Sequence, residues 1–152
     1  MDYSYLLHTK TADRWKRVGA KRRAGIAVPL FSVYSESSIG IGEIPDIKLL
    51  VDWCNKTGMS IIQLLPLNDV GSDFAPYNSV STFALDPMYL SLQLLKEVNV
   101  KDYENNLMDI KKRYRPLFGR VNYKIKKAKL NLLSKIYQEN SSDNINDLNL
   151  FI

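Results

Sequence analysis

Carboxyl, hydroxyl, amide and aromatic side chains gather in the segment from Asn68 to Asp86. A connection of this length inside a compact domain is usually functional. The acids on or near predicted loops are Glu43, Asp69, Asp73 and Asp86. Carboxyl groups act as general acids, bases or nucleophiles when their surroundings separate their pKa values. These four acids are candidates by residue type alone, because their spacing assigns no role to any of them.

Other side chains that could be reactive are scarce. The single histidine, His8, lies in the N-terminal lead-in, where a surface position is expected. The single cysteine, Cys54, excludes an internal disulfide and a cysteine-cluster zinc site. The run Gly40-Ile41-Gly42 lacks the third glycine and the Lys-Ser/Thr ending of phosphate-binding loops. We therefore expect no cofactor and no metal.

The net charge of +5 originates in the first 25 residues, because basic and acidic residues balance over the remainder. A basic arm can contact phosphates, but no zinc-finger spacing or RNA-binding aromatic motif accompanies it. A solvated lead-in without a nucleic-acid partner is therefore expected. Apolar runs are shorter than the roughly 18 residues of a membrane helix, and the N-terminus does not resemble a signal peptide. A cytoplasmic protein without a membrane partner fits these features.

Two apolar runs lie before the polar loop, over residues 24–30 and 59–65, and each predicts a buried strand. A helix is predicted between them, with Pro45 at its first position and Gly58 as its left-handed cap. Its apolar stripe consists of Ile47, Leu50, Val51 and Cys54, and its other faces carry Asp46, Lys48, Asp52 and Lys56. Cys54 is thus a core residue. Strand, helix and strand predict a parallel pair that is covered on both faces.

The polar loop then begins at the carboxyl end of a parallel strand, where α/β proteins place their ligand sites. Asp86 and Pro87 suit the start of a helix over the following leucines, with Asp86 as its cap, although alternation in part of this segment leaves a strand as the alternative. The segment from Lys101 to Lys129 is basic and interleaved with aromatic residues. A helical stripe consists of Val121, Ile125, Ala128, Leu132 and Ile136, so the basic residues are expected mostly on solvated outer faces. The polar run 138–146 is interpreted as a loop.

Five strings, in order over residues 23–137, resemble segments of the amylomaltase (4-α-glucanotransferase) family, glycoside hydrolase family 77. They are Arg23-Ala24-Gly25-Ile26 with Pro29-Leu30; Gly40-Ile41-Gly42-Glu43; Gln63-Leu64-Leu65-Pro66-Leu67; the loop from Ser72 to Pro87, which contains Pro76-Tyr77-Asn78-Ser79; and Val121-Asn122-Tyr123. Each string is weak alone. Together, at plausible separations, they specify the family.

This resemblance implies the first βαβ part of a (β/α)₈ TIM barrel, with an inserted helical segment and a truncated end. Residues 1–22 would be a basic lead-in or linker, 23–98 the start of the catalytic barrel, and 99–152 a helical insertion. The chain stops at an apolar segment, Leu148 to Ile152, and natural termini are rarely apolar and unsupported. We therefore expect a fragment that is marginally stable or prone to aggregate by itself.

The resemblance also implies retaining transfer of α-1,4-glucan segments to a glucose or maltose acceptor. That chemistry needs two carboxyl groups about 5–5.5 Å apart. The family's nucleophilic Asp, acid/base Glu and further Asp come from later barrel strands, so no catalytic residue is assigned here. Substrate contacts are expected from Tyr77, whose family counterpart lines the site, and from Asn78, Ser79 and Asp73. Asn78 and Ser79 could equally hold the turn. A non-catalytic protein that binds glucan or another protein remains the alternative.

Overall fold

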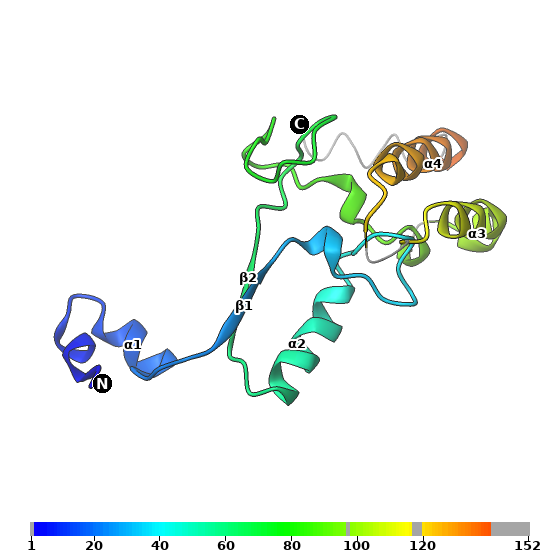
Figure 1. The fold of residues 1–152 in the computed structure, drawn as a ribbon. Helices are drawn as coiled ribbons and strands as arrows, with labels where there is room; N and C mark the ends of the chain where they lie inside the picture. The colour runs from blue at the N-terminus through cyan, green and yellow to red at the C-terminus, as the bar shows by residue number, and fades with distance from the viewer. Residues whose placement is uncertain (1, 97, 117–119, 141–152) are drawn as a thin grey trace.

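The computed structural model describes residues 2–96, 98–116 and 120–140. These residues form a two-stranded parallel sheet in which β1 (Gly25–Val28) pairs with β2 (Ile61–Leu64). The helix α2 (Asp46–Lys56) lies between the strands in the chain and packs beside them (Figure 1). The predicted order of strand, helix and strand, and its parallel pairing, are therefore confirmed.

Cover on both faces of the strands was also predicted, and this is wrong for the residues described. In both strands exposed residues alternate with half-buried ones, and none is fully buried. This pattern is typical of a sheet with one face covered, and α2 is the helix that packs on β2. The apolar side chain of Ile61 remains about half exposed as a result.

The helix α2 matches its prediction at the C-terminal end, but it begins one residue later than predicted, because Pro45 is its N-cap and Asp46 its first residue. Gly58 follows it with φ +74°, and its amide bonds to Asn55 O at 3.2 Å, as expected of a left-handed cap. Cys54 is buried, whereas Val51 on the same predicted stripe is about half exposed. Asp46, which was assigned to an outer face, is buried. That assignment was wrong because hydroxyl and amide donors from the preceding loop surround its carboxylate.

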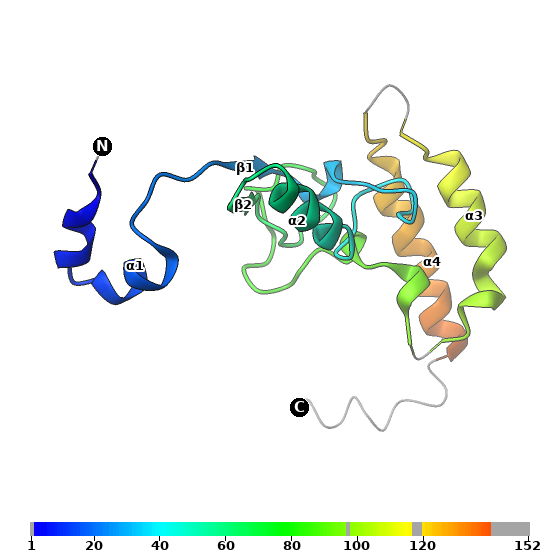
Figure 2. The same cartoon turned by 90° about the horizontal axis from the view of Figure 1, so that it is seen from below.

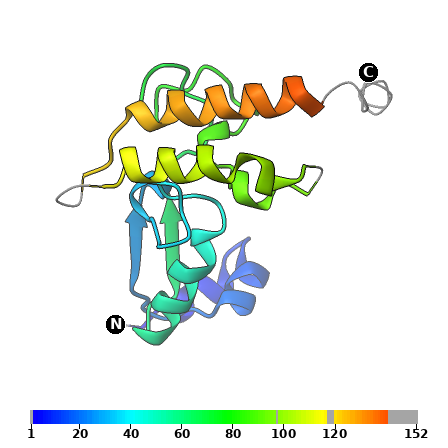
Figure 3. The same ribbon diagram turned by 90° about the vertical axis from the view of Figure 1, so that its right-hand side faces the viewer.

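The main core lies beyond the carboxyl ends of the strands rather than on the sheet. Figure 3 shows α3 (Glu104–Arg113) and α4 (Lys124–Asn140) side by side at that end. Core residues come from both helices and from the segments after β1 and β2: Leu30, Ile39, Ile41, Met88, Tyr89, Leu92, Tyr103, Leu107, Ile110, Ile125, Leu132 and Ile136. The predicted α4 stripe is confirmed, since its isoleucines and leucine are buried and Val121 and Ala128 pack against the cluster.

The continuous helix predicted after Asp86 is absent. Three short 3₁₀ turns take its place: η3 (Pro87–Tyr89), η4 (Leu92–Leu94) and η5 (Val100–Tyr103). Leu90 and Leu95 are extended and end the first two turns, so Tyr89 and Leu92 both reach the core. Here core packing overrides a local helical pattern.

The N-terminal residues form two short helices, η1 (Ser4–His8) and α1 (Ala12–Val18), in which no residue is buried. Figures 1 and 2 show this part standing away from the rest of the chain. At the other end α4 runs to Asn140, so the loop predicted from residue 138 starts too early. Residues 141–152, including the apolar end, lie outside the described residues, as does Phe118. Within the described part of the chain, no helix is long and apolar enough to cross a bilayer.

Candidate functional site

The polar loop after β2 is closed at its base by backbone hydrogen bonds. Asn68 and Leu85 form an antiparallel bridge, and the Asp69 amide donates to Ala84 O at 2.9 Å. The Val80 amide donates to Asp69 O at 2.9 Å, which holds the middle of the loop against its base. The loop is therefore an ordered projection from the carboxyl end of a parallel strand.

A tight turn at the tip is organised by Asp73. Its Oδ1 accepts from the amides of Phe74 (2.6 Å) and Ala75 (3.3 Å), and its Oδ2 accepts from Asn78 Nδ2 at 2.8 Å. The Asn78 side-chain amide and these backbone amides hold the pKa of Asp73 below its ordinary value of 3.8. Of the two roles left open for Asn78, the geometry supplies the one that holds the turn.

This turn presents Tyr77 to solvent. The tyrosine is 76% exposed, and its neighbour Ser79 is exposed as well. Two apolar residues of the same loop that the sequence analysis did not single out, Phe83 at 94% and Val80 at 71%, are also exposed. An apolar residue inside a polar loop was the only sequence signal that could have found them. The loop therefore exposes three separate aromatic or apolar side chains to solvent.

The acids at the two ends of the loop meet a lysine from α4. Lys126 Nζ lies 3.3 Å from Asp69 Oδ1 and also bonds to Asp86 Oδ2. Asp86 Oδ1 accepts from the Met88 amide at 3.0 Å, so the predicted cap is confirmed, although on a 3₁₀ turn. Burial and the Asp86 charge raise the pKa of the neighbouring Tyr89 to about 12.

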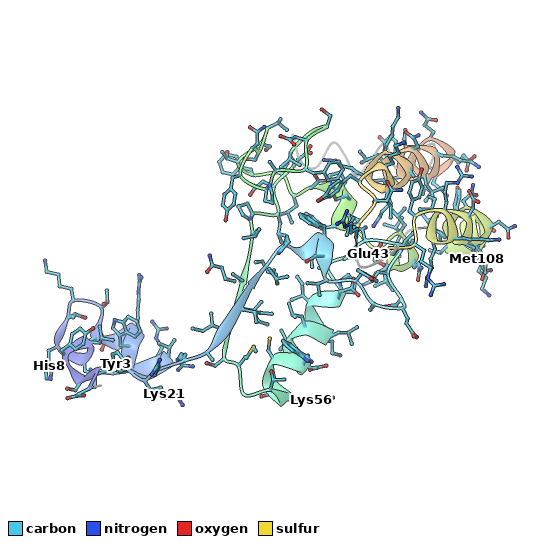
Figure 4. All side chains as sticks on the ribbon, viewed as in Figure 1. Tyr3, His8, Lys21, Glu43, Lys56 and Met108 are labelled. Carbon is cyan, nitrogen blue, oxygen red and sulfur yellow. The ribbon has the colours of Figure 1, made fainter. Side chains whose placement is uncertain are left out.

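A second buried lysine lies one turn further along α4. Lys129 Nζ bonds to Glu43 Oε1 at 2.6 Å and to Leu90 O at 2.8 Å. Burial lowers the pKa of Lys129, and the Glu43 carboxylate opposes that shift. Figure 4 shows Glu43 where the segment after β1 meets the helices α3 and α4, with His8 far from it. Solvated outer faces were predicted for the basic residues, and for Lys126 and Lys129 this is wrong because buried carboxylates pair with them.

The loop after β1 is packed around Asp46. Its carboxylate accepts from Ser35 Oγ (2.6 Å), Ser38 Oγ (2.8 Å) and the Glu43 amide (2.7 Å). A side chain at Gly42 would lie 1.9 Å from Leu30 O, so this glycine permits close backbone packing. Gly42 therefore permits the close approach of these backbone segments, whereas Gly40 adopts a positive φ of +68°. The four acids of the sequence analysis thus all have internal structural partners.

An aromatic cluster joins the loop to α4. The rings of Phe74 and Tyr123 lie 4.4 Å apart, and Phe31 meets Tyr123 edge-on at 6.1 Å. An open groove of about 1040 Å³ runs beside this cluster, between the loop and the helices α3 and α4. Phe74, Tyr114 and Tyr123 line the groove, but Tyr77 does not. The groove therefore reaches the turn at Phe74 but does not include the exposed Tyr77.

The chain shares its sequence pattern with one family over most of its length. The family described as 4-alpha-glucanotransferase, glycoside hydrolase family 77, matches residues 28–152. The chain belongs to this family. The earlier resemblance is thereby confirmed.

Similar proteins agree with the family assignment. A 4-alpha-glucanotransferase of Chlamydia pneumoniae is 45% identical over 107 residues, which are 70% of this chain and 20% of that protein. One from Chlamydia caviae is 42% identical over 125 residues, 82% of this chain and 23% of that protein. The chain thus spans about a fifth of the length of these family members.

The crystal structure of amylomaltase from Corynebacterium glutamicum has a related fold. It superimposes with a TM-score of 0.64, covering 84% of this chain and 19% of that one, at 19% identity. This likeness supports the α/β arrangement described above.

Proposed function

We propose that this chain forms the beginning of the (β/α)₈ barrel of a 4-α-glucanotransferase and contributes part of its α-1,4-glucan site. The observation that carries the proposal is the turn Asp73–Asn78 of this glucanotransferase-family chain, which exposes Tyr77 at the carboxyl end of a parallel strand. Barrel enzymes place their substrate sites at that end of the strands. A tyrosine can stack its ring on the apolar face of a glucose unit while its hydroxyl bonds to a sugar hydroxyl.

The chemistry of the whole enzyme is retaining transfer from an α-1,4-glucan donor to a glucose or maltose acceptor, in the cytoplasm. It needs two carboxyl groups about 5–5.5 Å apart, one as nucleophile and one as acid and base. Glu43, Asp69 and Asp86 are each paired with a lysine, and Asp73 is used by the turn. We therefore assign binding to these 152 residues and catalysis to other residues of the enzyme.

In this proposal residues 1–22 are a basic lead-in, 23–98 begin the barrel and 99–152 are a helical insertion. The two isolated N-terminal helices support the first boundary. The third segment contains α3 and α4, which pack on the loops after β1 and β2 rather than on the strands. An insertion placed over the strand ends can shape a substrate site.

Binding of maltoheptaose tests the assignment of Tyr77. The Tyr77→Ala variant should bind about three- to tenfold more weakly, because the stacking contribution of an aromatic ring is about 0.5–1.5 kcal/mol. Tyr137→Ala is the matched control, since Tyr137 is also exposed but lies on α4, outside the loop. Isothermal titration calorimetry measures both affinities. Equal losses in the two variants, or no binding by the unaltered chain, would contradict the proposal.

A disproportionation assay tests the assignment of catalysis. The chain alone should produce no glucose or longer glucans from maltotriose, measured by chromatography against a protein-free control. If glucose or longer glucans form with the purified protein but not in the protein-free control, the catalytic carboxylates are present in this chain after all. If the chain binds glucan only as a stand-alone protein and forms no part of an active transferase, the non-catalytic alternative holds instead.

A further inference from the structure

Lys126 of α4 connects the two ends of the polar loop. Its Nζ lies 3.3 Å from Asp69 Oδ1 at the start of the loop and bonds to Asp86 Oδ2 at its end. The same Nζ lies 5.8 Å from the centre of the Phe74 ring, next to the turn. One ammonium group from the helical segment therefore contacts the loop at both ends and near its tip.

These contacts are buried enough to constrain geometry. The side chain of Lys126 is 6% exposed and that of Asp86 is 0% exposed, whereas Asp69 retains 33%. A buried ammonium is unfavourable unless carboxylates and other acceptors surround it at bonding distance. The loop cannot shift relative to α4 without separating this ion cluster.

The loop transmits that constraint to its tip. Asp69 Oδ1 also accepts from the Gly71 amide at 2.9 Å, and Asp69 O accepts from the Val80 amide. The turn that presents Tyr77 begins two residues after Gly71, with Asp73. The position of the Asp69 residue thus sets the direction in which the turn leaves the base of the loop.

We propose that Lys126 is a positioning residue for the glucan site, holding the loop 69–86 so that Tyr77 is presented in a fixed orientation. Only the identity of the ligand rests on the proposed function. Lys126 has no assigned contact with glucan and acts through Asp69 and Asp86. In this view the helical segment carries a determinant of substrate binding.

Two lysines of the same helix give a matched comparison. Lys126→Met removes the tie to the loop, whereas Lys129→Met removes an equally buried lysine whose partners are Glu43 and Leu90 O. Amide hydrogen exchange at Asp69 and Val80 reports the loop base directly, because both amides donate within the loop. Isothermal titration with maltoheptaose reports the presentation of Tyr77.

In Lys126→Met we expect exchange at the Asp69 and Val80 amides to accelerate about tenfold or more relative to amides of α4, as a local opening. Maltoheptaose affinity should fall about three- to tenfold, within the range expected for Tyr77→Ala, because Lys126 acts by holding the loop that presents this ring and binding groups must be held to about 0.5 Å. Lys126→Arg keeps the charge and should recover most of both losses. Lys129→Met should change the stability of the whole chain without this local difference.

Unchanged relative exchange at Asp69 and Val80 in Lys126→Met would overturn the proposal, whatever happens with glucan. Faster exchange with unaltered maltoheptaose affinity would overturn the positioning role. If the unaltered chain does not bind maltoheptaose, the proposed function fails. Amide hydrogen exchange at Asp69 and Val80 still shows whether Lys126 holds the loop. If Lys126→Met does not fold, the variant Asp69→Asn provides the test instead. It removes the charge of the more exposed partner of Lys126. Locally faster exchange at Val80 would then support the tie, and unaltered exchange would overturn it.

Discussion

At the scale of single residues, two carboxylate–lysine clusters are buried in the part of the chain that the structure describes. Lys126 and Lys129 of α4 lose their hydration and regain partners only from segments far away in sequence. Such pairs add little net stability when intact, but leaving one partner alone in the interior is costly. The sequence showed the lysines and the acids, yet it could not pair them, because the pairing depends on where α4 packs.

The pair of Lys129 and Glu43 gives a stability prediction. Lys129→Met should lower the free energy of unfolding by about 3–5 kcal/mol, since it leaves the buried Glu43 carboxylate without its cation. The double variant Lys129→Met, Glu43→Leu should recover much of that loss, because neither charge remains. Urea denaturation followed by circular dichroism measures both. Equal destabilisation of the single and double variants would contradict the role of the unpaired charge.

Asp69 gives a pH prediction. The Gly71 amide, and to a smaller extent Lys126, lower the pKa of Asp69 below 3.8, its ordinary value. The Asp69 carboxylate therefore binds a proton more weakly in the folded chain than in the unfolded chain. Its contribution to the free energy of unfolding is present above pH 3.8 and is lost as the pH falls through the lower pKa of the folded state. Asp69→Asn should remove this part of the acid dependence. Urea midpoints measured from neutral pH into this acid range should converge for the two proteins, and parallel curves would contradict the assignment.

At the scale of elements, the loop between β1 and α2 is fixed by close backbone packing. A Cβ at Gly42 would lie 1.9 Å from Leu30 O and 2.4 Å from Val33 O, whereas one at Gly58 would meet nothing within 4 Å. Only the tertiary arrangement shows that Gly42 is needed for space, because the contacting atoms lie about ten residues away.

These glycines allow a paired test at the element scale. Gly42→Ala should cost about 3 kcal/mol, because the clash is with backbone that cannot rotate away. Gly58→Ala should cost only about 1 kcal/mol, since its φ of +74° disfavours a side chain but the space is open. Denaturant unfolding of both variants measures the difference. A smaller loss for Gly42→Ala than for Gly58→Ala would show that the loop is looser than described.

At the scale of the whole molecule, apolar surface remains uncovered around the βαβ unit. Leu49, Val51 and Trp53 of α2 and Ile61 of β2 are each about half exposed. Strands with unpaired edges and exposed apolar faces favour association with other chains. The α/β class, the parallel pair and the α4 stripe could be predicted from local periodicity. How much of each sheet face is buried could not be predicted, because burial depends on which elements pack on that face.

The chain studied alone should therefore show a broad thermal transition, bind a hydrophobic dye and associate at high concentration. Replacing the half-exposed Trp53 with lysine should reduce dye binding and association without lowering the helical signal, because this side chain is outside the core. Calorimetry, dye fluorescence and light scattering measure the three properties. A sharp cooperative melt without dye binding would contradict this expectation.

Local sequence determined the features that depend on neighbouring residues: the two strands, the helix with its Gly58 cap, the Asp86 cap and the family strings around Tyr77. These follow from steric and hydrogen-bonding preferences that act over a few residues. Only the tertiary structure decided that Asp46, Lys126 and Lys129 are buried, and that the predicted helix after Asp86 breaks into turns. Burial depends on which segments pack together. The buried lysine–carboxylate pairs Lys126–Asp86 and Lys129–Glu43 join residues 40 and 86 positions apart, and no local pattern encodes those distances.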